Sequence, residues 1–74
     1  MAPHTDLELT KIIALQFAKK HNMNYTIFIL NPNDKGEFDI NAGSSYEMVI
    51  DTYWEKPRPN TKIVCTTDEL LGKL

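Results

Sequence analysis

The sequence contains a single cysteine, Cys65, among its 74 residues. One thiol cannot form an intramolecular disulfide, so the disulfide scaffolds of small secreted proteins are excluded. Only two histidines are present, and neither they nor the thiol occur at a spacing typical of zinc sites. We therefore expect neither a structural metal nor a cofactor.

Long apolar runs and a basic N-terminal segment are also missing. No stretch of the sequence is long and apolar enough to span a bilayer, and the first residues lack the pattern of a signal peptide. Ten acidic residues against eight basic ones give a net charge of −2. An acidic balance disfavours nonspecific binding to nucleic acid or to anionic membranes. We expect a cytoplasmic protein that does not bind membranes.

The remaining composition is that of a folded domain. Hydrophobic residues make up 42% of the chain and charged residues 24%, which is ordinary for a globular protein. Residues 1–4 are predicted to be a flexible N-terminal arm, and residues 5–74 a single domain. Since so short a chain has room for one small core, we expect modest stability.

The beginning of this domain is predicted to be a helix. Thr5 and Glu8 fit a capping box, in which each side chain satisfies a free backbone N–H. Asn22 is a suitable stop. Between them, large apolar side chains recur at helical spacing and are expected to face the core. These residues are Leu9, Ile12, Ile13 and Phe17.

A β-hairpin is predicted to follow the helix. Residues 24–30 are β-branched and aromatic with almost no polar face, which is typical of a central strand. Residues 31–36 contain the proline, asparagine and glycine of a turn. Residues 37–41 alternate between polar and apolar side chains, as in a strand with one face in solvent.

The second half of the chain is predicted to contain a helix, a strand and a final helical turn. Ser44 and Glu47 fit a second capping box, and a segment rich in proline ends this helix. Residues 62–66 are expected to form the third strand, and Thr66 with Glu69 a capping box for the short C-terminal helix. The apolar stripe of the second helix comprises Tyr46, Val49, Ile50 and Tyr53.

These elements predict an α+β fold with the order α-β-β-α-β and a short C-terminal helix. A right-handed crossover through the second helix places the third strand beside the first, so the predicted sheet order is 2-1-3. Two helices are expected to cover one face of this sheet. The other face then needs cover of its own, and a homodimer through it is one hypothesis.

Nothing in the sequence assembles a catalytic set. Histidine is the usual general base near neutral pH, and neither His4 nor His21 lies in a known catalytic motif. Cys65 falls in a predicted buried strand, where a thiol behaves as a small hydrophobe with a raised pKa. We therefore expect no enzymatic activity.

The middle of the chain is strongly acidic, with six acidic side chains and one lysine between residues 34 and 55. On the predicted second helix, Glu47, Asp51 and Glu55 lie at i, i+4 and i+8 and form one ridge, with Trp54 beside it. Tryptophan is enriched at binding hot spots. The leading hypothesis is a non-enzymatic protein-binding module, an inhibitor or regulator. Its acidic ridge and Trp54 would contact a basic patch on a partner protein. The alternative is a solvated face with Trp54 packed over the edge of the core.

Basic residues follow directly after this ridge. Lys56, Arg58 and Lys62 alternate with prolines close to Trp54, and cations beside aromatic rings bind nucleic-acid backbones and bases. This second hypothesis, weak nucleic-acid binding, is disfavoured because three cations in an acidic domain form a small footprint. A stiff loop that neutralises the acidic ridge is the simpler interpretation. In composition alone, the chain resembles the accessory proteins that phages and mobile elements use against host machinery.

Overall fold

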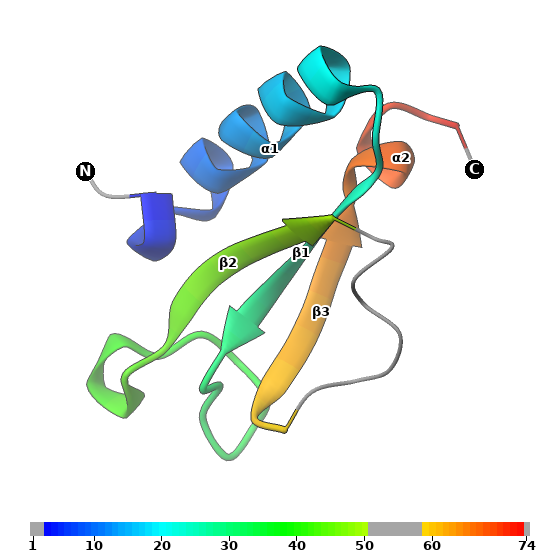
Figure 1. The fold of residues 1–74 in the computed structure, drawn as a ribbon. Coiled ribbons are helices and arrows are strands. Elements are labelled where there is room, and N and C mark those ends of the chain that lie inside the picture. The colour runs from blue at the N-terminus through cyan, green and yellow to red at the C-terminus, as the bar shows by residue number, and fades with distance from the viewer. Residues whose placement is uncertain (1–2, 51–58, 74) are drawn as a thin grey trace.

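A computed structural model describes residues 3–50 and 59–73, to which the structural statements below refer. A long helix and a short helix pack against a three-stranded antiparallel sheet in the order β2-β1-β3 (Figure 1). The α+β class and the sheet order are as predicted, and two helices pack against the sheet, although the second of them is the short C-terminal helix and not the one predicted after Ser44. The elements are η1 (Pro3–Thr5), α1 (Leu7–His21), β1 (Tyr25–Leu30), η2 (Ile40–Ala42), β2 (Ser45–Ile50), β3 (Thr61–Thr66) and α2 (Thr67–Leu70).

Strand β1 is the centre of the sheet, as predicted, and supplies most of the core. Residues 25–29 are all buried, and Ile27 is 0% exposed. Alternate side chains point to opposite faces. The ring of Tyr25 lies 6.2 Å from that of Phe17 on α1, so Tyr25, Ile27 and Ile29 form the face beneath the helix. The β-branched and aromatic content that predicted this strand also fills the core.

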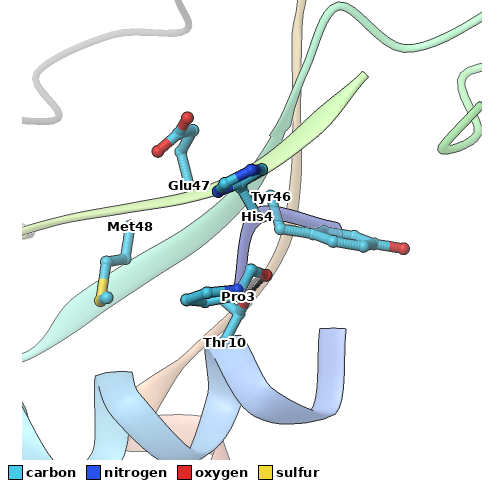
Figure 2. A pocket seen from close by; sticks show the side chains of 6 residues that line it. All are labelled: Pro3, His4, Thr10, Tyr46, Glu47 and Met48. Carbon is cyan, nitrogen blue, oxygen red and sulfur yellow. Dashed lines mark hydrogen bonds between the residues drawn. The ribbon is translucent and has the colours of Figure 1, made fainter. Parts of the chain in front are cut away.

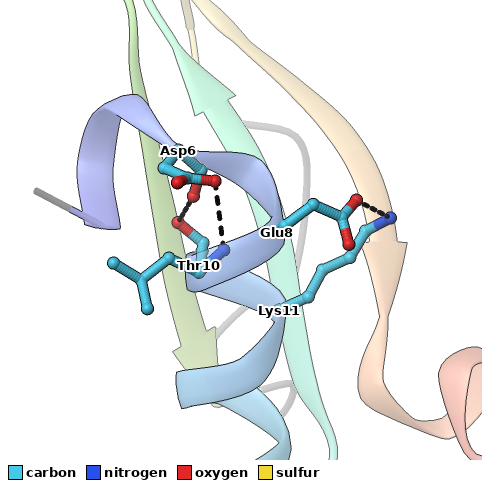
Figure 3. A network of polar contacts seen from close by, with 5 residues as sticks. Asp6, Glu8, Thr10 and Lys11 are labelled. Atoms are coloured by element: carbon cyan, nitrogen blue, oxygen red, sulfur yellow. Dashed lines mark hydrogen bonds and ion pairs between the residues drawn. The ribbon is translucent and has the colours of Figure 1, made fainter. Parts of the chain in front are cut away.

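The helix α1 begins later than predicted, because its cap is Asp6 and not Thr5. The Asp6 carboxylate accepts the backbone N–H of Leu9 at 3.2 Å, while Thr5 belongs to η1. The Glu8 carboxylate lies 3.5 Å from the Lys11 ammonium, three residues further along the helix (Figure 3). The helix ends as predicted, at an Asn22 with a left-handed backbone.

The face of α1 that packs on the sheet also differs from the prediction. The buried helix residues are Thr10, Ala14 and Ala18, spaced at i, i+4 and i+8. Ala14 is 0% exposed, whereas Ile12 from the predicted stripe is 53% exposed. Small side chains let the helix backbone approach the sheet closely, and the Thr10 hydroxyl is satisfied because it donates to backbone carbonyls of the preceding turn.

The predicted strand over residues 37–41 is not formed. This segment belongs to the long connection between β1 and β2 and includes the start of η2. The Asp39 side chain caps that turn by accepting the Asn41 amide at 2.9 Å. The Phe38 ring stacks on Tyr46, with centroids 4.5 Å apart and planes at 5°. Local capping and this ring contact replace the strand that the alternation suggested.

The predicted second helix is wrong where the structure describes it, because residues 45–50 form the strand β2. This strand pairs with all of β1, from Tyr25 opposite Ile50 to Leu30 opposite Ser45. Ser44 caps nothing, since its hydroxyl donates to the Asn31 carbonyl. Pairing with β1 satisfies the backbone of a segment rich in β-forming side chains. The rest of the predicted helix lies outside the described residues. The helix in the predicted order α-β-β-α-β is therefore not tested there.

Strand β3 and helix α2 match their predictions closely. The Thr66 hydroxyl accepts the backbone N–H of Glu69 at 3.3 Å and caps α2. A register shift leaves Val64 as an extra residue in the ladder between β3 and β1. Because β1 is central, β2 and β3 are the edge strands (Figure 1).

Candidate functional site

The acidic ridge predicted on a helix is not formed at its first residue. Glu47 lies on the strand β2, opposite Phe28 of β1, and its side chain is exposed. Asp51, Trp54 and Glu55 lie outside the described residues. The ridge required Glu47 on a helix with Asp51 at i+4, so the predicted ridge is wrong at Glu47.

The predicted basic loop is represented by one described residue. Lys62 lies on β3, opposite Ile29 of β1, and its side chain is exposed. Its ammonium reaches the 31–36 turn, where it would come within 3.2 Å of a Cβ added at Gly36. Lys56 and Arg58 lie outside the described residues. The structure therefore places Lys62 against a turn that carries one acidic and one basic side chain, Asp34 and Lys35.

Sequence reasoning missed the surface that the large side chains of α1 form on the side away from the sheet. We call this surface the outer α1 face and define it by Leu9, Ile12, Gln16 and Lys19. With about 100° per residue, Ile12 and Gln16 each lie about 160° around the helix axis from the buried Ala14. The signal was present in the sequence, because Thr10, Ala14 and Ala18 form a stripe of small residues on the opposite side.

Apolar exposure among the described residues is concentrated on and just after α1. Three of the six large hydrophobic residues that are exposed there belong to this region: Ile12, Phe17 and Met23. The other three lie one each on η2, β3 and α2. Leu9 and Ile13 are half-buried beside Ile12 and extend the apolar area along the helix. Ile12 is therefore the exposed apolar side chain of the outer α1 face, with the half-buried Leu9 beside it and the polar Gln16 and Lys19 on the same side.

Charged side chains lie at the two ends of the outer α1 face. Glu8 lies in the first turn of α1, and its side chain is 81% exposed. Lys19, Lys20 and His21 lie in the last turn and are all exposed. This distribution of charge complements the helix dipole and gives the two ends of the outer α1 face opposite charge.

A small pocket lies between η1 and β2. Its volume is about 140 Å³, well below the ~300 Å³ typical of the smaller ligand sites. Figure 2 shows the side chains that line it, with Thr10 beside Pro3 and the His4 ring near Tyr46. The Thr10 hydroxyl already donates to backbone carbonyls, so it offers no free donor to a ligand. The lining residues are Pro3, His4, Thr10, Tyr46, Glu47 and Met48.

The remaining reactive group is the thiol of Cys65, which is half-buried on β3. Burial raises the pKa of this thiol above its ordinary value, and the nearby Glu69 carboxylate raises it further, while Lys11 opposes both. At neutral pH the thiol is protonated and a weak nucleophile. Within residues 3–50 and 59–73, no group of three or more acidic, histidine or cysteine side chains is placed to hold a metal ion.

The helices in the described part of the chain are too short or too polar to cross a membrane. Comparison with protein-family models, with curated proteins and with solved structures found no match.

Proposed function

We propose that this chain is a non-enzymatic protein-binding module, an inhibitor or regulator, that contacts its partner through the outer α1 face. The observation that carries this proposal is the contrast between Ile12 and Ala14. The larger side chain is 53% exposed at the middle of the helix, while the smaller one is fully buried against the sheet.

An exposed apolar surface of this kind is typical of a protein interface. Single exposed hydrophobic residues are common, whereas a continuous apolar area bordered by charged groups marks an interaction site. Ile12 is exposed between the half-buried Leu9 and Ile13, and the charged Glu8 and Lys19 lie near the two ends of the helix. An amphipathic helix that presents i, i+3 and i+4 side chains to a partner is a recurring mode of protein recognition.

Two further observations support a binding role over a catalytic one. Burial raises the pKa of the Cys65 thiol, so it forms less of the thiolate that nucleophilic catalysis uses than an ordinary cysteine does. The pocket between η1 and β2 is small, and the Thr10 hydroxyl in it is already hydrogen-bonded. Weak nucleic-acid binding through Lys56, Arg58 and Lys62 is the alternative. Salt-dependent retention on nucleic acid that disappears in the Lys56→Ala, Arg58→Ala variant would favour it.

The proposal is tested by photo-crosslinking in the native host. A photoreactive residue at position 12 is compared with the same residue at position 40, because Ile40 is also exposed but lies on η2. We expect adducts with protein from position 12 and none from position 40. Adducts from position 40 alone, or from neither position, would contradict the proposed surface.

A further inference from the structure

We propose that the partner of the outer α1 face is a second copy of this chain, whose own α1 lies antiparallel across the same surface. This inference rests on the proposed function, since it identifies the protein that the proposed surface binds. It is carried by the arrangement of charge and apolar side chains along α1.

The charges on α1 fit an antiparallel pair. Glu8 and Lys19 are separated by eleven residues, or about three turns, so they lie only about 20° apart around the helix axis. Both side chains are exposed on the same flank of the outer α1 face. A two-fold axis midway between them places Glu8 of each copy opposite Lys19 of the other. A parallel pair would instead place like charges opposite each other, which is unfavourable.

The apolar residues fit the same arrangement. Ile12 lies within two residues of this axis, so the two copies of Ile12 pack close together at the centre of the interface. Leu9 and Gln16 lie on either side of Ile12 on the helix and surround that contact. The two helix dipoles run in opposite directions and attract each other.

The size of the surface predicts a weak dimer. The 15-residue helix α1 is about 22 Å long, and a contact along one helix buries less than the ~1,200 Å² of the smaller stable interfaces. We therefore expect association that depends on concentration and is lost on dilution. The edge strands β2 and β3 remain outside this interface.

The experiment is sedimentation velocity on the full chain over a wide concentration range. Ile12→Ser is compared with Ile40→Ser, which removes the same side chain from a more exposed position on η2. We expect wild type and Ile40→Ser to dimerise equally. Ile12→Ser should dimerise at least about tenfold more weakly. Thermal melting in dilute solution verifies that each variant is folded.

Charge reversal then tests the orientation. Glu8→Lys and Lys19→Glu should each weaken the dimer, because each places like charges opposite one another, and the double variant should restore it. Glu37→Lys, a reversal at an exposed position in the connection before β2, is the matched control and should have no effect.

A dimer that the double variant does not restore would contradict the antiparallel pair. A dimer unaffected by Ile12→Ser would place the interface elsewhere. A wild type that stays monomeric throughout would overturn self-association, while adducts from position 12 with a different protein would leave the proposed function standing.

Discussion

The side chain of Thr67, at the start of α2, accepts the backbone N–H of Tyr25, the first residue of β1, at 2.9 Å. The same hydroxyl donates to Asn24 Oδ1 at 3.1 Å, and Asn24 Oδ1 also accepts the Asp68 amide at 3.0 Å. Thr67 is fully buried. Two segments more than forty residues apart are thereby joined at the end of the sheet, so the short C-terminal helix is part of the core.

Replacing Thr67 by valine should destabilise the fold by about 1–3 kcal/mol, because the buried N–H of Tyr25 loses its acceptor while the side-chain volume is kept. Thr67→Ser keeps the hydroxyl and should retain most of the stability that this hydrogen bond contributes. Urea unfolding of both variants measures the difference. Equal stability of Thr67→Val and wild type would show that the hydrogen bond contributes nothing.

Truncation of Ile27 should have a much larger effect than truncation of Ile63. Ile27 is 0% exposed on the central strand, and its change to alanine should lower the free energy of unfolding by about 2–5 kcal/mol. Ile63 is 46% exposed on the edge strand β3, and the same change there should have a clearly smaller effect. Thermal melting compares the two. Similar losses at both positions would contradict the placement of the core.

The packing of α1 predicts opposite outcomes for two substitutions by leucine. Ala14→Leu forces a large side chain between the helix and β1 and should destabilise the fold by about 1–3 kcal/mol. Gln16→Leu adds the same side chain to the exposed side of the helix and should leave folding almost unchanged. If the outer α1 face self-associates, Gln16→Leu should also strengthen the dimer. A tolerated Ala14→Leu would contradict the observed orientation of the helix.

The environment of Cys65 predicts slow alkylation. Burial raises the pKa of the thiol, so the pH of half-maximal alkylation should be higher for the folded chain than for the chain in urea. The neutral thiol is favoured in the fold. Its contribution to stability is therefore complete below the ordinary thiol pKa and is lost as the pH rises through the folded-state pKa. Lys11→Met should raise the pKa further, because Lys11 favours the thiolate. Identical alkylation profiles for the folded and unfolded chains would contradict this account.

Much of the fold was predictable from the sequence because several signals agreed. The β-branched run of 25–30 and the cap at Thr66 each had one consistent interpretation. The segment 45–50 did not, because Tyr46, Val49 and Ile50 fit both the spacing of a helix and the preferences of a strand. Pairing with β1, a long-range interaction that local periodicity does not encode, decides in favour of the strand.

The candidate site was missed in the sequence for a related physical reason. Hydrophobic periodicity assigned Ile12 to the core, since it assumes that the largest apolar side chains face inward. The sheet instead packs against Ala14 and Ala18, whose small size allows close approach. Knowing which of two faces packs inward requires the position of the sheet, and the exposed face became a candidate site only once that position was known.

The central claim is that the outer α1 face is the surface through which this domain binds a protein, here a second copy of the chain. Amide NMR spectra of the isotopically labelled chain, recorded from dilute to concentrated solution, test it residue by residue. The account predicts concentration-dependent shift changes along Glu8–Lys20 of α1, with β3 and the connection before β2 unchanged. Shift changes confined to the edge strands β2 and β3, with α1 unaffected, would contradict it.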